Sequence, residues 1–449
     1  MGKDLLPHQI EDARFLASKK FAGCFSGMGS GKTLTALEAA KHAFTTAHTG
    51  PNAAIIVGPP ISLFMWKEEF EQHLGKRAQL LATGKTVIDP NADAWIMSYE
   101  IATKRRDELK ALGAKVLICD ESHALKSTTA KRTQAIIGKH GLCESVGHTW
   151  LLTGTPVTRW NDDIFSFMCR AGAGQLAEKI GKVDLGRFRL RYCVVQKKKF
   201  SQRQRFATEV TVGNRNTDEL NELLFDGGMA VRRELADVWA AMPPLTINHL
   251  QVQLEKTPEL RELLKALEKK SMNEIREDIG KKEEHIATTR RLIALAKVKH
   301  AAIEIADRVE AGVSPILVGC WHIEVIDELH NLLTAKGVRA AKLDGRTPSQ
   351  LKQTLQQDFN DGNLDVLVGQ IAAMGVSLNL QGGSHIIEVE TDWSPAVMDQ
   401  FMARCHRIGQ KDHVHVDVFE ADTKLDQAVR RISAAKRSGQ STIMEQDDE

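Results

Sequence analysis

The 449-residue sequence contains no closely spaced pair of cysteines. Its seven cysteines are scattered, at positions 24, 119, 143, 169, 193, 320 and 405. The scatter favours reduced thiols in a cytoplasmic compartment and argues against a zinc site, which needs grouped ligands. His140, Cys143 and His148 are near one another in the sequence, but such a group is far more often structural than metal-binding.

Long apolar runs are also missing. No run approaches the ~18 residues of a membrane-spanning helix, and the first residues lack the apolar core of a secretion signal. Met1-Gly2 is followed by Leu6 where an N-myristoylation signal has serine or threonine. We therefore expect neither a lipid anchor nor a membrane partner.

Neither sign of charge is in excess, since the formal net charge is +2 at pH 7. Any nucleic-acid contact must then come from local basic patches and not from a global field. The apolar content of 42% and the charged content of 26% are those of a soluble globular protein. The length suits two or three domains, each with its own core.

A glycine-rich segment, residues 26–33, is the feature around which the rest of the chain is organised. Its sequence is Ser-Gly-Met-Gly-Ser-Gly-Lys-Thr, and it follows a short apolar run and precedes a helical pattern. Glycines in such a loop let backbone N–H groups converge on phosphate oxygens, and the following helix directs its positive end at them. Lys32 is predicted to contact the β- and γ-phosphates of ATP, and Thr33 to hold Mg²⁺. The remaining residues of the predicted cradle are Met28, Gly29, Ser30 and Gly31.

The loop departs from the usual pattern at one position, because Ser26 stands where the first glycine is expected. A plain glycine turn before a helix is the alternative. The two interpretations are separated by whether the other parts of a nucleotide site occur further along the chain.

Two adjacent carboxylates, Asp120 and Glu121, follow the apolar run Val116–Cys119. A parallel sheet places its ligands at the carboxyl ends of its strands, which is where this run delivers them. We predict that Asp120 enters the coordination sphere of Mg²⁺ and that Glu121 is the catalytic residue that orients the attacking water. An exposed acidic turn is the alternative, and the phosphate loop upstream argues against it.

Strand-like and helix-like stretches alternate along the first part of the chain. Ala53–Val57 has the pattern of a buried strand, Leu63–Phe70 that of a helix with an apolar face, and Ala94–Ser98 that of a second strand. Such alternation predicts right-handed βαβ units and a parallel sheet.

The motifs in this order resemble the first motor lobe of superfamily 2 helicases, and within them the SNF2-like DNA translocases. The matching strings are GMGSGKT, IIVGPPISLFMWKEEF, MSYE, LICDESH and LLTGTP. The superfamily often lacks the first glycine of the loop, which accounts for Ser26. The resemblance implies that Gln9 binds the adenine and that Pro59, Pro60 and Ser98 lie in loops near the DNA backbone.

The middle of the chain is locally basic, with eight basic residues and no acidic one between Leu185 and Ala207. The alternation of arginine with apolar residues predicts a strand with its charges on one face. A basic face beside a motor indicates phosphate contact, but a solvated surface insertion explains the run equally well. The residues assigned to DNA contact are Arg187, Arg189, Arg191, Lys197, Lys198 and Lys199.

The second half repeats the strand and helix alternation from Pro315 onward and ends in the string RCHRIGQ at 404–410. Arg404 and Arg407 are three apart, which predicts one side of a helix, and a guanidinium is the suited donor for a transferring γ-phosphoryl group. Two helical arginines are usually surface charges, but this string resembles the most distinctive motif of the SNF2-like family. We assign both arginines to catalysis. Gly375 and Gln410 are assigned to the nucleotide site and Trp393 to DNA, although a core position suits Trp393 equally well.

The expected fold class is α/β, with two RecA-like lobes, each a parallel sheet flanked by helices, and with helical and basic insertions between them. We expect lobe 1 at residues 1–235, with the basic insertion at about 160–225, and a linker with a helical protrusion at 236–312. Lobe 2 is expected at 313–435 and a disordered acidic tail at 436–449.

The resemblance implies a DNA-dependent ATPase that couples ATP hydrolysis to translocation along double-stranded DNA, with ATP and Mg²⁺ as cofactors. Contacts to the DNA backbone give little sequence preference. The strings at 372–380, 390–395 and 423–426 are similar to the branch of annealing helicases and fork remodellers. We expect a monomeric minimal motor of bacterial or viral origin.

Two alternatives stay open. One is a strand-separating DExH helicase that acts on DNA or RNA and shares the ATP chemistry. The other is a non-hydrolysing DNA-binding adaptor built on a decayed motor, against which the intact Lys32, Asp120 and Glu121 argue.

Overall fold

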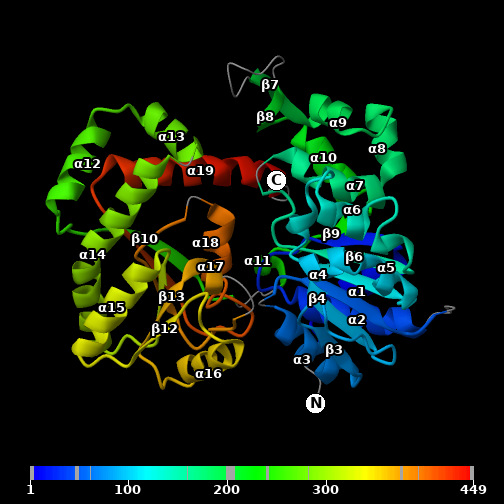
Figure 1. The fold of residues 1–449 in the computed structure, drawn as a ribbon, viewed down its shortest axis with the longest axis horizontal. Coiled ribbons are helices and arrows are strands. Elements are labelled where there is room, and N and C mark those ends of the chain that lie inside the picture. Colours follow the sequence, from blue (N-terminus) through cyan, green and yellow to red (C-terminus); the bar gives the residue numbers. More distant parts are fainter. Residues whose placement is uncertain are drawn as a thin grey trace. The chain divides into compact units, whose positions relative to one another are not determined.

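The computed structural model describes residues 5–45, 50–60, 62–158, 160–198, 208–238, 242–281, 283–374, 378–392 and 394–444. The chain divides into two compact units, which we call lobe 1 (Met1–Val238 together with Gly439–Glu449) and lobe 2 (Trp239–Ser438). Each is built around its own parallel sheet (Figure 1).

Lobe 1 contains a seven-stranded sheet in the order β3-β4-β2-β5-β6-β1-β9, and all of its strand pairs are parallel. The strands are β1 (Phe21–Cys24), β2 (Ala54–Gly58), β3 (Ala78–Leu81), β4 (Ala94–Ser98), β5 (Val116–Asp120), β6 (His148–Leu152) and β9 (Ala230–Val231). The central strands are apolar throughout because both faces of the sheet are covered, as with the fully buried Ile55, Ile56 and Val57. The order places β6 between β5 and β1, so the loops that follow these three strands are neighbours.

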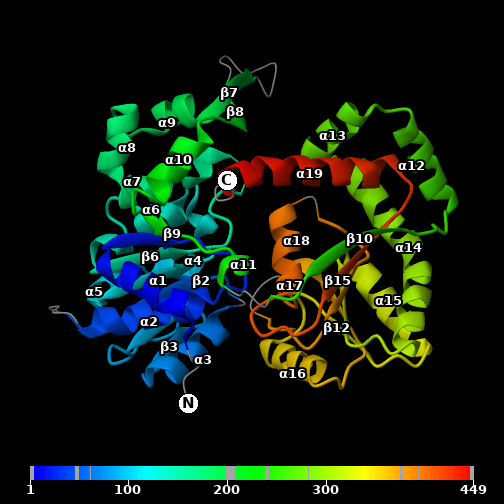
Figure 2. The same cartoon turned by 180° about the vertical axis from the view of Figure 1, so that it is seen from behind.

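Helices cover both faces of this sheet. One face packs on α1 (Pro7–Ser18), α2 (Lys32–Thr45) and α3 (Leu63–Leu74), which bury Leu16, Leu37 and Trp66 in a shared core. Figure 2 shows α1 and α2 lying side by side over the sheet. The helices that contribute to the core of the other face are α4 (Tyr99–Lys104), α5 (Arg106–Ala111), α6 (Lys131–Ile137), α7 (Phe165–Ala171), α8 (Ala173–Ile180), α9 (Leu185–Tyr192) and α10 (Thr217–Leu224).

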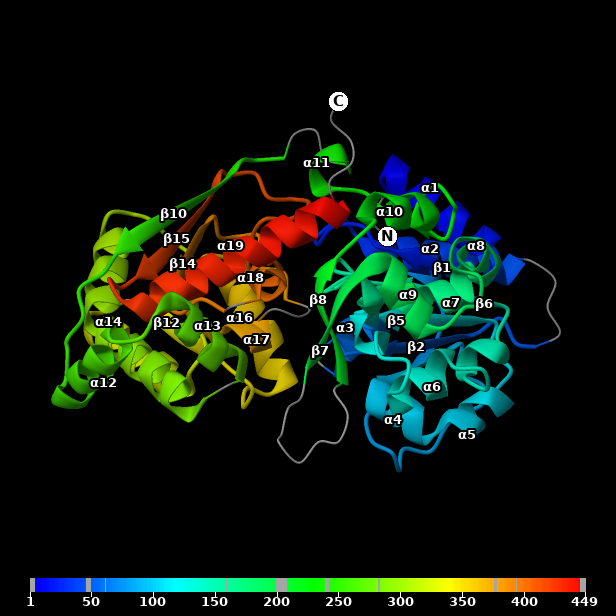
Figure 3. The ribbon, with the colours of Figure 1, turned by 90° about the horizontal axis from the view of Figure 1, so that it is seen from above.

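Shorter elements complete lobe 1. The described residues include 3₁₀ turns at η1 (Ser122–Leu125), η2 (Leu142–Glu144) and η3 (Asn161–Ile164) and the short helix α11 (Leu235–Val238). Strands β7 (Cys193–Lys198) and β8 (Thr208–Asn214) form a separate antiparallel pair, which Figure 3 shows beside α9.

The segment predicted as a basic strand is a helix, so that prediction is wrong. Residues 185–192 form α9, and the Asp184 carboxylate caps it by accepting a hydrogen bond of 2.9 Å from the Arg187 N–H. Phe188 and Tyr192 are fully buried, and because they are four residues apart they share one face of a helix. Over so few residues, alternating arginine and apolar residues fit the two-residue period of a strand and also the 3.6-residue period of a helix. The Asp184 cap and the buried pair Phe188 and Tyr192 favour the helix.

Lobe 2 contains a six-stranded sheet in the order β10-β15-β14-β11-β13-β12, again with parallel pairs throughout. The strands are β10 (Leu245–Gln251), β11 (Ile316–Cys320), β12 (Ala340–Leu343), β13 (Val366–Gln370), β14 (His385–Glu388) and β15 (Val414–Glu420). Strand β10 comes from the stretch 236–312 that the sequence assigned to a linker and helical protrusion. We therefore propose that the sheet of lobe 2 begins at β10 and not at the expected residue 313.

Two cores flank the sheet of lobe 2. Helices α14 (Glu284–Glu310) and α15 (Ile323–Ala335) close one face, and α16 (Ser349–Asn360), α17 (Ile371–Met374) and α18 (Pro395–Met402) close the other. A third cluster joins α12 (Pro258–Glu268) and α13 (Met272–Lys281) to α14 and to α19 (Lys424–Met444). Two parallel sheets, each flanked by helices, confirm the predicted α/β class.

Candidate functional site

The glycine-rich loop after β1 has the backbone that its sequence predicts. Gly29 and Gly31 have φ values of 78° and 84°, in the left-handed region that favours glycine. A Cβ atom at Gly31 would lie 2.2 Å from Nε2 of Gln9, so a side chain there would displace the Gln9 amide. The loop passes directly into α2, whose first residue is Lys32.

The Lys32 ammonium is directed back at its own loop. Its Nζ donates hydrogen bonds of 2.9 Å to the carbonyl oxygens of Ser26 and Gly27. The helix N-terminus, the glycine backbone and this cation are thus brought to one place at the carboxyl edge of the sheet. Together they form a site for an anion.

The start of α1 lies against the same loop. The side-chain amide of Gln9 accepts a hydrogen bond of 2.8 Å from the Leu6 N–H and donates one of 3.4 Å to the Gly31 carbonyl. Nε2 of His8 lies 3.2 Å from the Ser30 carbonyl oxygen. Gln9 is therefore next to the cradle, as its assignment requires, and its adenine contact stays a prediction.

Asp120 ends β5 and is held in three places. Its Oδ2 accepts a hydrogen bond of 2.8 Å from the Trp66 indole, and its Oδ1 accepts one of 3.0 Å from the Glu121 N–H. The Tyr99 hydroxyl donates to its carbonyl oxygen at 2.7 Å. Burial, and next the nearby Glu121 carboxylate, raise the pKa of Asp120 to about 6, against the opposing effects of Trp66 and Lys32. A cation bound beside this carboxylate would favour its charged form.

Glu121 has a backbone conformation that is unusual for its residue type, with φ 49° and ψ 49°. A non-glycine residue in this left-handed region costs about 1–3 kcal/mol, and such residues cluster at functional sites. His123 Nδ1 lies 3.3 Å from Glu121 Oε2 and 3.4 Å from the Thr153 hydroxyl. The loops after β5 and β6 are connected through this histidine.

Sequence reasoning missed several of these partners. Trp66, Tyr99 and His123 lie within the strings that carry the family resemblance, but the sequence predicts no role for them. Thr153 directly follows a predicted strand, which was the available sequence signal for a site role. That signal could not be used, because the tertiary fold decides which strands are neighbours. Trp66 lies 54 positions from Asp120, and no local pattern connects them.

The lobe 1 residues assigned to DNA by resemblance lie at the same edge of the sheet. Pro59 and Pro60 follow β2, and Ser98 ends β4. The Ser98 hydroxyl caps α4 by accepting a hydrogen bond of 3.3 Å from the Ile101 N–H. Their contact with DNA stays a prediction.

The arginines of α9 do not form the open basic face that the sequence predicted. Arg187 lies 3.7 Å from the Asp184 carboxylate, and Nε of Arg189 lies 2.7 Å from Asp162. Arg191 makes two bonds to Glu219, of 2.8 and 2.5 Å. These acids belong to the cap of α9, to η3 and to α10, so the charges pair within lobe 1.

The lysines of the basic run are placed differently. Lys197 is exposed in β7, and Lys198 ends that strand. Lys199 lies outside the described residues. DNA contact by the basic run stays a prediction, and among its described members Arg187 and Lys197 are exposed.

In lobe 2, Arg404 and Arg407 are close together, although they do not share a helix as predicted. Helix α18 ends at Met402, and both arginines lie in the turns that follow it. The two side chains converge because each donates to the Leu378 carbonyl, at 3.3 Å from Arg404 and 3.5 Å from Arg407. A second backbone bond, from the Leu380 N–H to the Arg404 carbonyl at 2.9 Å, holds the two loops together.

Gln410 is 3% exposed and holds the end of the segment that contains Arg404 and Arg407 through hydrogen bonds. Its Nε2 lies 3.1, 2.9 and 3.2 Å from the carbonyl oxygens of Gln381, Gly383 and Cys405. Its Oε1 accepts from the N–H groups of residues 411 and 412. Both the N–H donors and the carbonyl acceptor of this amide are hydrogen-bonded within the protein. A contact with the nucleotide would therefore require some of these bonds to break. Gly375 and Trp393, also assigned from the sequence, lie outside the described residues.

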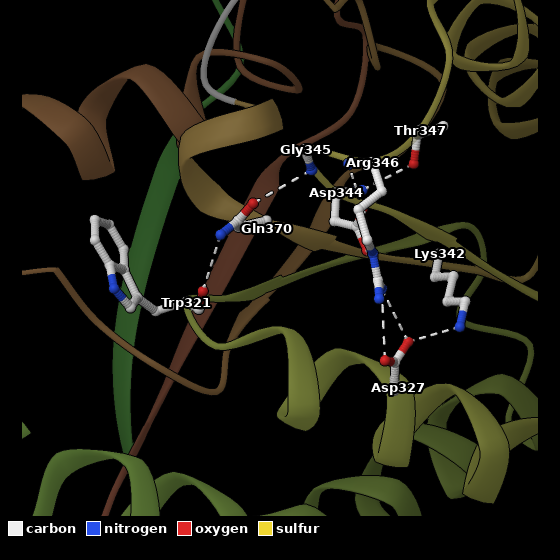
Figure 4. Close-up of polar contacts among 8 residues, drawn as sticks. All are labelled: Trp321, Asp327, Lys342, Asp344, Gly345, Arg346, Thr347 and Gln370. Atoms are coloured by element: carbon white, nitrogen blue, oxygen red, sulfur yellow. Dashed lines mark hydrogen bonds and ion pairs between the residues drawn. The ribbon is translucent and has the colours of Figure 1, made fainter. Parts of the chain in front are cut away.

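The carboxyl ends of β11, β13 and β12 carry a second polar network, drawn in Figure 4. The Gln370 amide bridges two loops, donating to the Trp321 carbonyl and accepting from the Gly345 N–H, both at 3.3 Å. It therefore fixes the loops after β11 and β12 relative to the end of β13.

Charge pairs hold the loop that follows β12. The Arg346 side chain makes three hydrogen bonds to the buried Asp344 carboxylate, of 3.2, 3.0 and 2.5 Å, and also reaches Asp327 of α15 at 3.3 Å. Lys342 lies 2.6 Å from the same Asp327 (Figure 4). Hydrogen bonding to Arg346 lowers the pKa of Asp344, so this carboxylate stays charged.

Among the described residues, no helix is both long and apolar enough to cross a membrane.

Comparison with known families matches residues 8–302 to the SNF2-related domain and residues 299–409 to the helicase conserved C-terminal domain. A similar curated protein is the "SWI/SNF-related matrix-associated actin-dependent regulator of chromatin subfamily A-like protein 1 homolog" of Caenorhabditis elegans. It is 26% identical over 434 residues, which cover 94% of this chain and 59% of the relative.

Two further relatives are animal proteins. "DNA repair and recombination protein RAD54B" of Gallus gallus is 25% identical over 98% of this chain and 54% of its own length. "DNA annealing helicase and endonuclease ZRANB3" of Mus musculus is 25% identical over 94% of this chain and 39% of its own length. The chain spans about half the length of the curated relatives it matches, 39% to 59% for these three. The bacterial or viral origin expected from the sequence stays a prediction.

A solved structure, the Sulfolobus solfataricus SWI2/SNF2 ATPase core in complex with dsDNA, is similar with a TM-score of 0.43 and 17% identity. The similarity covers 98% of this chain and 92% of that one. The family assignment depends on the two family matches, which together run from residue 8 to residue 409. The chain belongs to the SNF2-related family, as the order of its motifs predicted.

Proposed function

We propose that this chain is an ATP-hydrolysing motor that moves along double-stranded DNA. The observation that carries the proposal is the grouping of three loops at the carboxyl edge of the lobe 1 sheet. The phosphate loop follows β1, Thr153 follows β6, and the Asp120–Glu121 pair ends β5, in three adjacent strands. The family match adds support, because the same segments carry its motifs.

The residues present suit a magnesium-bound nucleoside triphosphate. Gly29 and Gly31 give the loop its left-handed turns, and the Lys32 ammonium lies at the loop, where it donates to the Ser26 and Gly27 carbonyls. The buried Asp120 is a carboxylate that lacks a nearby ammonium partner at hydrogen-bond distance among the contacts described for it. A hard divalent cation prefers such an oxygen ligand.

Each residue then has a defined part in hydrolysis. Lys32 would exchange its bonds to the loop carbonyls for bonds to phosphate oxygens, and the Thr33 hydroxyl and Asp120 would hold Mg²⁺. When bound there, Mg²⁺ would supply positive charge against the phosphate oxygens. Glu121 accepts a hydrogen bond from water and orients it for attack, while His123 holds the Glu121 carboxylate. Arg404 and Arg407 act on the transferring phosphoryl group, a contribution that reaches ~10³ to 10⁵ in rate for arginine fingers.

The DNA part of the proposal comes from the family and from its relatives' names. RAD54B is named for DNA repair and recombination, and ZRANB3 is named as a DNA annealing helicase. We propose that Pro59, Pro60 and Ser98 border the DNA backbone, with Lys197 as an additional phosphate contact. Such contacts predict little sequence preference and strong sensitivity to salt.

The test measures phosphate release by the purified chain with duplex DNA, single-stranded DNA, forked DNA and RNA side by side. We expect stimulation by DNA that contains duplex. No hydrolysis with any nucleic acid would contradict the proposal and favour a DNA-binding adaptor.

A second assay separates translocation from strand separation. The chain should displace a triplex-forming strand from an intact duplex in the presence of ATP. Unwinding of a tailed duplex without triplex displacement would instead support a strand-separating helicase.

A further inference from the structure

The phosphate loop departs from its usual pattern at Ser26, and the structure gives this serine a partner. Ser26 is only 2% exposed, and its Oγ accepts a hydrogen bond of 3.1 Å from the backbone N–H of Arg233. In the opposite direction, the Gly27 N–H donates to the Arg233 carbonyl at 2.8 Å. Arg233 therefore holds the first two residues of the loop by reciprocal backbone contacts, which we call the Ser26–Arg233 clasp.

The clasp continues the parallel pairing of β1 with the edge strand β9. Gly23 pairs with Ala230 and Cys24 with Val231 in the sheet. The Phe25 N–H then donates to the Val231 carbonyl at 2.8 Å, and Gly27 to Arg233 follows with the same spacing. The first half of the phosphate loop is thus fixed to β9 although the loop itself is outside the sheet.

The Arg233 side chain extends the clasp to α1. Its Nε lies 3.1 Å from Oδ1 of Asp12, and its Nη2 lies 3.0 Å from Oε2 of Glu11. Asp12 is 2% exposed, so the guanidinium is the partner that a carboxylate in this position needs. Helix α1 is also the helix that places Gln9 against Gly31.

We propose that Ser26 and Arg233 are positioning residues that set the phosphate loop for nucleotide binding, an inference that rests on the proposed ATPase function. Lys32 is held by the carbonyls of Ser26 and Gly27, the same two residues that the clasp restrains. A glycine at position 26 restores the usual pattern but removes the side-chain acceptor of the Arg233 N–H. The serine is therefore a functional part of this loop and not a neutral departure from its pattern.

The main test compares Ser26→Gly and Ser26→Ala with the wild-type full chain. Without this bond the loop must be ordered when the nucleotide binds. If that costs about as much as one hydrogen bond, the affinity for nucleotide should fall roughly five- to ten-fold. We expect this change in the dissociation constant of MgADP by titration calorimetry and in KM for ATP, with kcat changed less than about two-fold. Ser26→Thr keeps the hydroxyl and should retain at least half of the lost affinity. Ser145→Ala, in a remote turn where Oγ donates to Leu142, is the matched control and should bind MgADP as the wild type does.

A second pair of variants tests the side-chain half of the clasp. Arg233→Ala leaves its backbone N–H in place but leaves the Asp12 carboxylate without its guanidinium, so nucleotide affinity should fall by about three-fold or more. Adding Asp12→Asn to Arg233→Ala removes the uncompensated charge and should restore most of that affinity. Such non-additivity is the signature of a coupled pair.

The outcomes separate this inference from the proposed function. Equal MgADP affinity of Ser26→Gly and the wild type would overturn the clasp, and so would a fall in kcat with unchanged affinity. If Ser26→Gly does not fold, as judged by its circular dichroism, the Arg233→Ala and Asp12→Asn comparison decides in its place. Absence of ATP hydrolysis by the wild type would contradict the proposed motor while leaving the MgADP comparison valid.

Discussion

The indole of Trp66 donates a hydrogen bond of 2.8 Å to the Asp120 carboxylate, from a helix on one face of the lobe 1 sheet to the end of its β5 strand. This bond occupies Oδ2, while Oδ1 accepts from the Glu121 N–H. The proposed metal ligand is therefore oriented by a side chain from a separate helix, α3. Partners of this kind fix the geometry of the ligand and tune its affinity for the metal.

Replacing Trp66 by Phe should raise the Mg²⁺ concentration needed for half-maximal ATPase activity by about ten-fold, since partners behind a metal ligand typically contribute that much. Trp95→Phe is the matched control. Both indoles are fully buried, and that of Trp95 donates at 2.8 Å to the Asp89 carbonyl instead. An equal Mg²⁺ response of the two variants would show that core packing, and not the bond to Asp120, is responsible.

Removing the proposed catalytic groups one at a time should abolish DNA-stimulated turnover. Lys32→Ala, Glu121→Gln and Arg407→Ala are each expected to lower kcat by at least ~10²-fold, because each removes a group acting on the reacting phosphate or water. Steady-state phosphate release with duplex DNA measures the effect. Glu178→Gln and Arg276→Ala change exposed residues of α8 and α13 and serve as charge-matched controls. Full turnover in the three site variants would contradict the mechanism.

The raised pKa of Asp120 predicts a pH dependence of stability with a definite sign. A carboxyl group whose folded pKa exceeds its ordinary value binds more protons in the folded state, so stability falls as pH rises through that window. For Asp120 the window lies between the ordinary value of 3.8 and about 6. Without nucleotide or metal, Asp120→Asn should therefore raise the melting temperature at pH 8 by a few degrees relative to the wild type.

The same substitution should have little effect near pH 4, where the wild-type carboxyl group is itself neutral. Thermal melts of both proteins at the two pH values provide the measurement. Identical shifts at pH 4 and pH 8 would show that the ionised carboxylate is not the cause.

The ion pairs of α9 predict different roles for two basic residues of the same run. Arg191 is paired with Glu219, which also accepts a hydrogen bond of 2.6 Å from the Tyr192 hydroxyl. Arg191→Ala should lower the melting temperature of the protein while changing duplex affinity by less than about two-fold. Lys197 is exposed, and Lys197→Ala should weaken duplex binding and reduce the slope of log affinity against log salt by about one.

Fluorescence anisotropy with labelled duplex at several salt concentrations measures both effects. If the two variants weakened duplex binding equally, Arg191 would contact DNA and the ion pair with Glu219 would not exclude it from the DNA-binding surface.

Much of the fold and of the lobe 1 site follows from short segments of sequence. The glycine pattern before Lys32 and the apolar run before Asp120 specify a strand, a turn and a chemical group within a few residues. Backbone preferences and apolar periodicity act over that distance. The α/β class and the family were therefore accessible from the sequence.

Local sequence patterns do not predict the structure where one short pattern is compatible with two different backbone conformations. The arginines at 187–191 fit an amphipathic strand over so few residues, but the Asp184 cap and the pair Phe188–Tyr192 favour a helix. The spacing of Arg404 and Arg407 suggests a helical face, but α18 ends at Met402 and the Leu378 carbonyl brings the two side chains together.

The sequence by itself determined which chemical groups stand at the strand ends: the glycines and Lys32 after one strand, and Asp120 and Glu121 at another. Only the tertiary structure decided which distant residues restrain them. Trp66 reaches Asp120, and Arg233 reaches Ser26 across 207 positions. The physical reason is that these contacts depend on the order of strands in the sheet and on helix packing, which are set by burial of the whole core and not by any local pattern.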